Sequence, residues 1–356
     1  MSTQRIALLQ ERLIKEEWDA FVVSTPENRC YLSGFTGSAG FLLITPDQRL
    51  LLTDFRYIEQ AEHEAPDFTV TKLTNGFASQ LPNLIDRYDL RTIAFESANV
   101  TVSEYKDWEK AAPNVHWLPT QEIVEAQRVT KEPVELAAIR QAAHLTDDAF
   151  THLIALLQPR MTELEAAWVL ESYMRTHGGD KVAFELIVGS GPNGAQPHAT
   201  ASRRQIRPGE AIVIDIGTVV AGYHSDMTRT LCLGQPDGQF QELYPIVLEA
   251  QETAERTIKP GMTGQEADQI ARDIITQAGW GTAFGHSLGH GVGLEIHEAP
   301  RLGPASTTVL QPGMVVTIEP GIYIPNWGGI RIEDLVVITE TGCEILTRSH
   351  KEPIVQ

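Results

Sequence analysis

The chain has 356 residues, of which 42% are hydrophobic and 21% charged, a composition typical of a folded globular protein with room for two domains. Its 28 Lys and Arg against 47 Asp and Glu give a formal net charge of −19, which repels phosphate backbones and anionic lipids and excludes nucleic acid and membranes as expected partners. The cysteines show no C-x-x-C spacing, and no apolar run approaches the roughly 20 residues that span a bilayer, so we predict a cytoplasmic protein without a disulfide framework.

The first part of the chain alternates helical and strand patterns. Residues 1–17 form an amphipathic pattern interrupted by charges, which indicates a helix and not a signal peptide. The pattern breaks before Pro133, which suits the first turn of a long helix. We therefore predict an α/β domain over residues 1–130 and a second domain over residues 131–356. Short apolar runs in the first domain predict strands at Ala20–Ser24, Gly40–Thr45, Arg49–Thr53, Thr69–Lys72 and Thr92–Glu96.

An internal repeat is the most informative feature of the second part. Pro159–Ala166 matches Pro260–Ala267, 101 residues later, and Ile206–Gly217 matches Leu310–Gly321, 104 residues later. The second pair predicts one strand in each repeat. A helix-then-strand unit therefore occurs twice, which favours two halves related by a pseudo-two-fold axis. The first pair predicts two helices that open with capping boxes, formed by Thr162 with Glu165 and by Thr263 with Glu266.

Acidic residues distinguish this repeat from a simple packing scaffold. Asp215 and Glu319 hold equivalent places at the ends of β-branched strands, where an ionised carboxylate is costly to bury without a partner. Each repeat offers a second carboxylate shortly afterwards, Asp226 or Glu333. If the halves face each other, four carboxylates converge and repel one another, and two divalent cations balance their charge. The pattern therefore predicts a metal site.

Three histidines are candidates for the remaining donors. His290 lies between two glycines, so a metal or substrate can approach it closely, and His297 follows seven residues later. His198 falls in the first repeat roughly where His297 falls in the second. These positions favour a role in a site over an ordinary surface or core role.

Other cofactor-binding and catalytic motifs are either incomplete or not supported by the surrounding sequence. Gly189–Gly194 matches the dinucleotide fingerprint G-x-G-x-x-G, but prolines interrupt the segment and no apolar helical face follows. His297 and Glu298 begin a zincin-like pattern, but position 301 is Arg, so H-E-x-x-H is absent. The chain also lacks a G-x-S-x-G elbow and a P-loop.

The whole set of residues resembles a known family. In order and spacing, five pieces are similar to the five-ligand signature of the pita-bread metallopeptidases: Asp215, Asp226, Gly289–Gly291, Ile318–Gly321 and Arg331–Asp334. The flanking segments resemble the Xaa-Pro branch, aminopeptidase P and prolidase, more than methionine aminopeptidase, namely Ser225–Thr230, Ile296–Pro300 and Gly313–Tyr323. Two upstream segments resemble the creatinase-like N-terminal domain of that branch, Tyr31–Gly40 and Thr53–Ala61.

The resemblance covers essentially the whole chain and implies a fold and a function. The implied fold is α/β (α+β), with a creatinase-like N-terminal domain followed by a pita-bread catalytic domain that contains the pseudo-two-fold repeat. The implied activity is that of a metallo-exopeptidase, which hydrolyses Xaa-Pro bonds in proline-containing peptides as a homodimer. Two divalent ions per subunit are expected, Mn²⁺ by the tendency of the family, with Co²⁺ and Zn²⁺ as alternatives.

The resemblance also implies a role for each metal ligand. Asp215 is expected to bind one metal only, Asp226 and Glu333 to bridge both, and His290 with Glu319 to complete the other. None of these ligand positions is substituted in this chain. Glu319 is further expected to carry the proton of the attacking water to the leaving nitrogen.

Five more residues match family positions around the metals. His198 and His297 match histidines that hydrogen-bond the substrate and the tetrahedral intermediate. Arg331 matches an arginine that holds a ligand carboxylate. Arg301 and Tyr323 match positions that line the substrate end of the site.

The sequence leaves the length of the substrate open, because aminopeptidase P and prolidase share all the metal ligands. Gly34–Gly40 and Thr53–Ala61 look more like aminopeptidase P, which favours cleavage of Xaa-Pro from longer peptides, and prolidase action on dipeptides is the alternative. Arg301 is a candidate to bind the free carboxylate of a dipeptide. A hypothesis from another class, a metal-free pita-bread binding module, is disfavoured because all five ligands are present.

Overall fold

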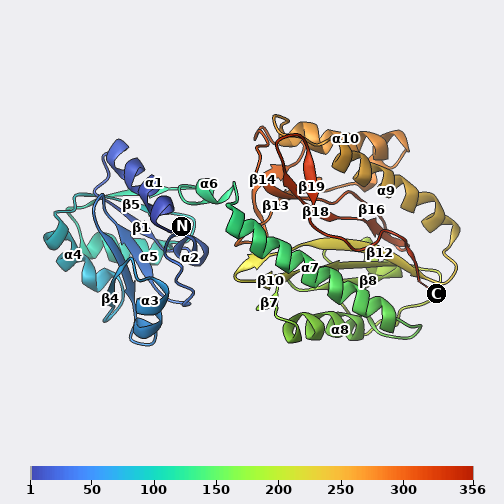
Figure 1. Ribbon diagram of the computed structural model, residues 1–356, viewed down its shortest axis with the longest axis horizontal. Helices are drawn as coiled ribbons and strands as arrows, with labels where there is room; N and C mark the ends of the chain where they lie inside the picture. Colours follow the sequence, from blue (N-terminus) through green and yellow to red (C-terminus); the bar gives the residue numbers. More distant parts are fainter. Residues whose placement is uncertain (1, 356) are drawn as a thin grey trace. The chain divides into compact units, whose positions relative to one another are not determined.

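The computed structural model describes residues 2–355, which divide into two compact units, Met1–Arg128 and Val129–Gln356 (Figure 1). The domain boundary that the sequence predicts, after residue 130, lies two residues beyond this division and remains our proposal. No helix among residues 2–355 combines the length and the hydropathy that crossing a bilayer requires.

The first unit is built on one mixed β-sheet. Its strands run in the order β4-β3-β2-β1-β5-β6, with β1 antiparallel to β2 and parallel to β5. In chain order the elements are α1 (Ser2–Lys15), β1 (Ala20–Val23), α2 (Pro26–Ser33), β2 (Phe41–Ile44), β3 (Arg49–Thr53), α3 (Ile58–Glu64), β4 (Thr69–Lys72), the 3₁₀ turn Ala78–Gln80, α4 (Leu81–Tyr88), β5 (Thr92–Glu96), α5 (Val102–Ala111), β6 (His116–Thr120) and α6 (Glu125–Arg128).

The central strand of this sheet, β1, is apolar along its whole length, and helices α4 and α5 pack against it. All four residues of β1 are buried. In α5, the Trp108 ring packs edge-on against Phe77 and Phe95 and lies 5.4 Å from the ring centroid of Trp117. This aromatic cluster joins α5 to the sheet.

A buried arginine fixes the loop between α2 and β2. Gly34 ends α2 with φ of 82°, a left-handed conformation that glycine adopts without strain. The guanidinium of Arg29 then donates hydrogen bonds to the carbonyl oxygens of Gly37 (2.7 Å) and Gly40 (2.8 Å). The glycine-punctuated segment is therefore an ordered loop.

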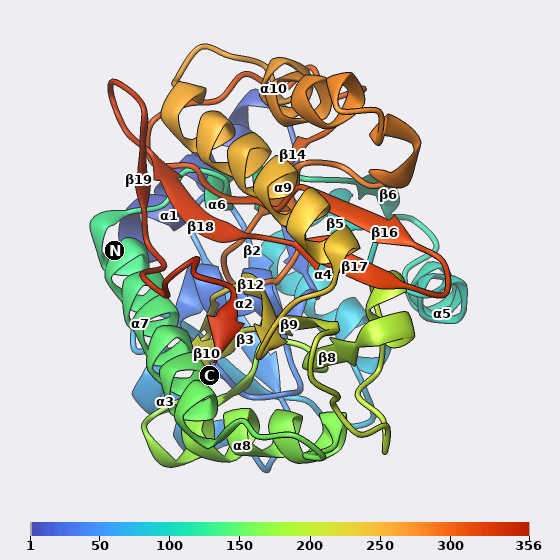
Figure 2. The same cartoon turned by 90° about the vertical axis from the view of Figure 1, so that its right-hand side faces the viewer.

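The second unit has strands between two pairs of helices (Figure 2). Its larger sheets have the strand orders β20-β12-β9-β8 and β14-β13-β15-β18-β19. The elements are α7 (Pro133–Leu156), α8 (Glu163–Thr176), β7 (Lys181–Val182), β8 (Ile187–Ser190), the 3₁₀ turn Gly191–Ala195, β9 (Ala211–Ile216), β10 (Thr218–Val220), β11 (Tyr223–His224), β12 (Met227–Leu233), α9 (Gly238–Thr257), α10 (Gly264–Gln277), the 3₁₀ turn Gly281–Ala283, β13 (Gly289–Gly291), β14 (Glu298–Leu302), β15 (Val315–Ile318), β16 (Gly321–Ile324), β17 (Gly328–Arg331), β18 (Asp334–Ile338), β19 (Cys343–Ile345) and β20 (Ile354–Val355).

The predicted internal repeat is visible in this unit. Helices α7 and α8 pack on β8, β9 and β12, and helices α9 and α10 pack on β15 to β18. Both predicted capping boxes are present, with Thr162 opening α8 and Thr263 opening α10. Each of these threonines also forms an isolated β-bridge, Thr162 with Gln205 and Thr263 with Val309. The two halves therefore repeat the same helix-to-strand connection.

Most predicted elements occur with small changes at their ends. The helix predicted over residues 1–17 is observed at Ser2–Lys15, and residue 1 lies outside the described residues. The strand predicted at Ala20–Ser24 ends at Val23, and the long helix begins at Pro133 as predicted. These differences are of the size expected at element ends, where hydrogen bonding is incomplete.

The aromatic cluster of the first unit gives a test of its packing. Trp108 is 2% exposed, whereas Trp168, in α8 of the second unit, is 66% exposed. We expect Trp108→Ala to lower the free energy of unfolding of the first unit by about 3–5 kcal/mol, because it leaves a cavity. Trp168→Ala, the matched control, should change stability by less than about 0.5 kcal/mol. Denaturant unfolding followed by circular dichroism measures both, and equal effects would contradict the assignment of Trp108 to the core.

Candidate metal centre

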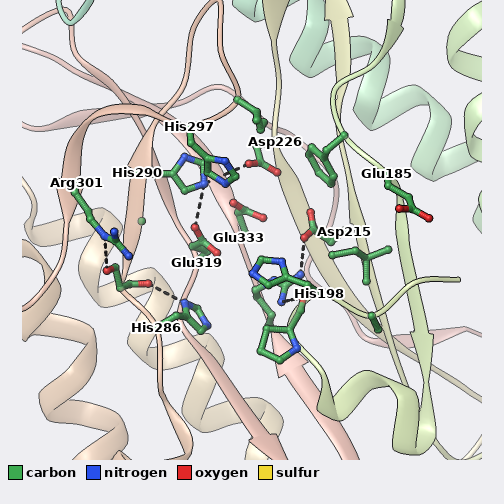
Figure 3. Close-up of a pocket in the computed structure, with 18 of the residues that line it drawn as sticks. Glu185, His198, Asp215, Asp226, His286, His290, His297, Arg301, Glu319 and Glu333 are labelled. Carbon is green, nitrogen blue, oxygen red and sulfur yellow. Dashed lines mark hydrogen bonds and ion pairs between the residues drawn. The ribbon is translucent and has the colours of Figure 1, made fainter. Parts of the chain in front are cut away.

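One cavity of about 520 Å³ in the second unit is lined by all five predicted metal ligands (Figure 3). The first repeat contributes Asp215 from β9 and Asp226 from the residue before β12. The second repeat contributes His290 from β13, Glu319 from the residue after β15 and Glu333 from the residue before β18. Strand ends of both repeats therefore bring residues more than 100 positions apart to one cavity.

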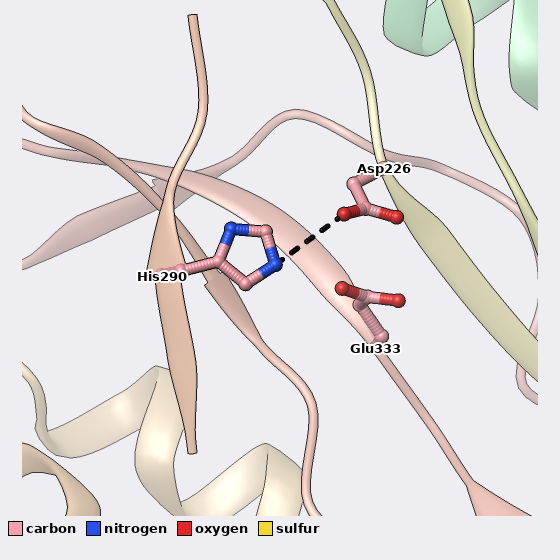
Figure 4. A group of neighbouring side chains, drawn as sticks. All are labelled: Asp226, His290 and Glu333. Atoms are coloured by element: carbon pink, nitrogen blue, oxygen red, sulfur yellow. Dashed lines mark ion pairs between the residues drawn. The ribbon is translucent and has the colours of Figure 1, made fainter. Parts of the chain in front are cut away.

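Three of these side chains form the tightest group. Single ligand atoms of Asp226, His290 and Glu333 lie within 4.8 Å of one another (Figure 4). His290 Nε2 is 3.6 Å from Asp226 Oδ2 and 3.4 Å from Glu319 Oε1. Asp215 Oδ1 is buried and accepts no hydrogen bond from any residue that the structure describes. The arrangement brings several electron-pair donors to face one another in the cavity, and at least one of them, Asp215 Oδ1, has no hydrogen-bond partner among the described residues.

The tautomer of His290 strengthens this conclusion. Its Nδ1 lies 3.1 Å from the carbonyl oxygen of Gly291, and a carbonyl oxygen only accepts hydrogen bonds. In the neutral ring Nδ1 therefore carries the proton, and Nε2 directs a lone pair at the carboxylates of Asp226 and Glu319. Such a set of donors is stable around a cation.

Burial is the main cause of the pKa shifts in this group. Burial raises the pKa of Asp226 well above its usual range, and the charges of Glu333 and Asp215 add to the shift. Burial likewise raises the pKa of Glu333, with Glu319 and Asp215 contributing. Burial lowers the pKa of His290, which keeps its ring neutral. A divalent cation among these groups favours their deprotonated forms and so opposes each upward carboxyl shift.

Arg331 connects two of the carboxylates. Its guanidinium forms an ion pair with Asp215 Oδ2 at 2.5 Å and donates to the Tyr323 hydroxyl at 2.7 Å. Its Nε donates to Thr228 Oγ1, which in turn donates to Glu333 Oε2 at 2.6 Å. One arginine therefore fixes Asp215 directly and Glu333 through a threonine, and leaves one oxygen of each carboxylate for a cation.

Tyr323 does not line the cavity wall itself but continues this chain of hydrogen bonds. His286 Nδ1 is 2.8 Å from the carbonyl oxygen of Ser287, so Nδ1 carries the proton of the neutral ring. Its Nε2 is then the acceptor for the Tyr323 hydroxyl at 3.1 Å. Burial raises the pKa of Tyr323 to about 12, so the phenol remains a donor at neutral pH. Tyr323 thus orients the His286 ring in the cavity wall.

The remaining predicted residues lie around the ligands. His198 and His297 both line the cavity, and the His297 ring packs edge-on against the His290 ring at 4.4 Å. Burial, followed by the nearby His290, lowers the pKa of His297. Arg301 Nε donates to Ser287 Oγ at 2.9 Å, and Arg301 forms no ion pair with any described residue. Its positive charge is therefore available to a substrate.

Sequence reasoning missed several residues of this site. His286 lines the cavity four residues before His290, and that spacing was a signal that could have found it. Thr228 and Thr317 hold ligand carboxylates through hydroxyl groups, for which the sequence offered no signal. Glu298 also lines the cavity, and it forms a buried ion pair with Lys131 at 3.2 Å.

Comparisons with known proteins agree with this arrangement. Residues 137–340 match Metallopeptidase family M24, and residues 5–130 match the Creatinase/Prolidase N-terminal domain. The uncharacterized peptidase YqhT of Bacillus subtilis is 41% identical over 337 residues, which cover 95% of this chain and 96% of that protein.

Two solved structures are similar over nearly their whole length. The Xaa-Pro dipeptidase from Bacillus anthracis has a TM-score of 0.97 at 39% identity, with 100% of each chain covered. The X-Pro aminopeptidase from Thermotoga maritima MSB8 has a TM-score of 0.91 at 39% identity, covering 98% of this chain and 100% of that one. The chain therefore belongs to metallopeptidase family M24, with a creatinase N-terminal domain followed by a pita-bread catalytic domain.

Proposed function

We propose that the protein is a two-metal exopeptidase that hydrolyses the bond between an N-terminal residue and proline, with peptides longer than two residues among its substrates. The observation that carries the proposal is the convergence of four carboxylates and His290 in one cavity, with Asp215 Oδ1 buried and unbonded among the described residues. Relatives named Xaa-Pro dipeptidase and X-Pro aminopeptidase support the choice of bond.

The donor set fits two divalent cations. We assign Asp215 to one ion, His290 and Glu319 to the other, and Asp226 and Glu333 to both, as the resemblance implies. Four carboxylates and one imidazole make a hard to borderline set, which suits Mn²⁺, with Co²⁺ and Zn²⁺ as alternatives. The chemistry that bound ions supply is polarisation of the scissile carbonyl and activation of water near neutral pH.

The protein side chains then carry the proton and orient the substrate. Glu319 Oε2 accepts no hydrogen bond from the described residues, so it can take the proton of the attacking water and pass it to the leaving nitrogen. His297 and His198, at the cavity wall, are placed to donate hydrogen bonds to the carbonyl oxygen of the substrate as negative charge develops there.

A proline substrate explains why this proton transfer matters. The nitrogen of an Xaa-Pro bond is a tertiary amide without N–H, and it leaves as an amine only after it has been protonated. An acid that is buried beside the attacked bond therefore accelerates the reaction. Glu319 lines the cavity, and we assign this transfer to it.

A specific observation favours a second candidate, a dipeptidase. Arg301 lines the cavity and has no carboxylate partner among the described residues, so it can bind the free carboxylate of an Xaa-Pro dipeptide.

A homodimer, which the resemblance implies, is also part of our proposal, and sedimentation velocity tests it.

Removal of metal should abolish the activity. We expect dialysis against a chelator to eliminate hydrolysis of an Xaa-Pro peptide, and addition of Mn²⁺ to restore it more fully than Co²⁺ or Zn²⁺, because the site consists mainly of oxygen donors. Release of proline, measured after each addition, reports the result. No activity with any of the three metals would support a binding module instead.

Two substitutions separate metal binding from catalysis. Glu319→Gln should lower kcat by about 10²–10⁴-fold, because it removes the proton acceptor and a ligand charge. His297→Ala should also lower kcat but leave the metal content nearly unchanged, since we assign His297 to the substrate. Elemental analysis of both purified variants provides the comparison, and loss of metal from the His297 variant would show that assignment to be wrong.

Substrate length distinguishes the two candidate activities. At matched metal loading, we expect turnover of an Xaa-Pro-Xaa tripeptide at least equal to that of the Xaa-Pro dipeptide. Arg301→Met should raise KM for the dipeptide more than for the tripeptide, because only the dipeptide places its carboxylate beside proline. A strong preference of the wild type for the dipeptide would identify a prolidase.

A further inference from the structure

Thr317 is a buried residue of β15 whose hydroxyl lies between two predicted metal ligands. It is 0% exposed, and it stands two residues before Glu319. Its Oγ1 accepts a hydrogen bond from the backbone N–H of His290 at 3.1 Å and donates one to Glu319 Oε1 at 3.0 Å. An N–H group only donates, so the single proton of the hydroxyl is directed to the carboxylate.

This contact makes the two oxygens of Glu319 different. Oε1 is held by Thr317 and lies 3.4 Å from His290 Nε2, so one cation could contact both atoms. Oε2 accepts no hydrogen bond from the described residues. One oxygen is therefore placed for a cation, and the other is free to exchange a proton.

The internal repeat has no hydroxyl at the equivalent position of its other half. The strand segment that ends in Asp215 has Val213 at the place that Thr317 takes before Glu319. Val213 is 2% exposed in β9, so a valine at this position packs well in the corresponding strand. The two equivalent carboxylates are also held differently, because Asp215 is bound by the guanidinium of Arg331.

This difference concerns orientation. Arg331 holds Asp215 through a charged guanidinium, whereas Thr317 holds Glu319 through a hydroxyl with a single proton. The hydroxyl therefore fixes the direction of Oε1 and leaves Oε2 without a hydrogen-bond partner among the described residues.

We propose that Thr317 is a positioning residue, whose hydroxyl turns Glu319 so that Oε1 faces the cation beside His290 and Oε2 faces the reacting bond. The proposal rests on the proposed function for its catalytic consequence. Its consequence for metal binding is independent of the substrate.

The test compares three variants of the full-length protein. Thr317→Val keeps the shape of the side chain and removes the hydroxyl, Thr317→Ser keeps the hydroxyl, and Thr218→Val is the control. Thr218 is also 0% exposed, but its hydroxyl donates to the carbonyl oxygen of Lys181 at 3.1 Å and touches no predicted ligand. Isothermal titration calorimetry measures the Kd for Mn²⁺, and steady-state kinetics measure kcat and KM for an Xaa-Pro-Xaa peptide.

We expect Thr317→Val to weaken Mn²⁺ binding by about 10–100-fold, the usual effect of losing a hydrogen bond to a ligand. At saturating Mn²⁺ its kcat should still fall about tenfold or more with KM within twofold, because a misoriented Glu319 transfers protons poorly. Thr317→Ser and Thr218→Val should stay within threefold of the wild type in all three quantities. If Thr317→Val does not fold, Thr317→Ala provides the same comparison.

The outcomes separate this inference from the proposed function. A wild type that binds Mn²⁺ without cleaving Xaa-Pro peptides would overturn the proposed function, while a raised Kd in Thr317→Val would still support the positioning of Glu319. Wild-type Kd and kcat in Thr317→Val would overturn the inference while cleavage by the wild type stands. A Thr317→Ser variant as defective as Thr317→Val would also overturn it, because the hydroxyl would then not be the cause.

Discussion

Four carboxylates that share one cavity are the constraint on which the catalytic unit depends. Asp215, Asp226, Glu319 and Glu333 cannot all be ionised there without positive charge, because burial and mutual repulsion both penalise the anions. Arg331, which also lines the cavity, supplies one positive charge, and among the described residues its ion pair is with Asp215. The remaining negative charge of the carboxylates requires cations, which is the physical reason that a chain with these residues is a metallopeptidase.

The duplicated architecture explains how such a costly cluster is assembled. Each repeat ends a buried strand next to a carboxylate, and the helices behind the strands supply the apolar packing that holds those ends in place. The two halves nevertheless differ in the side chains that hold their equivalent carboxylates. Asp215 is bound by an arginine and Glu319 by a threonine, so the two equivalent carboxylates are oriented by different side chains.

The direction of two hydrogen bonds fixes the tautomers of His290 and His286 in the site. Backbone carbonyl oxygens beside His290 and His286 each place the ring proton on Nδ1. His290 Nε2 then directs a lone pair toward the carboxylates, and His286 Nε2 accepts a hydrogen bond from the Tyr323 hydroxyl. Fixed tautomers of this kind pre-arrange the donors, so that little reorganisation is needed when a cation or substrate arrives.

Local patterns in the sequence determined the elements and the candidate ligands. Capping boxes, alternating apolar runs and glycines act within a few residues, so the helices at Thr162 and Thr263, the strands, and the duplication could be predicted from the chain alone. The order and spacing of Asp215, Asp226, His290, Glu319 and Glu333 along the chain identified the family by resemblance.

Only the tertiary structure decided how these side chains are held. Thr228 bonds Glu333 across 105 positions and Arg331 bonds Asp215 across 116, and no periodicity encodes such contacts. The role of Thr317 depends on the rotamer that places its hydroxyl between His290 and Glu319. The spacing of residues in the sequence indicates which side chains can bind a metal. The hydrogen bonds that orient these side chains form only when distant strands pack together.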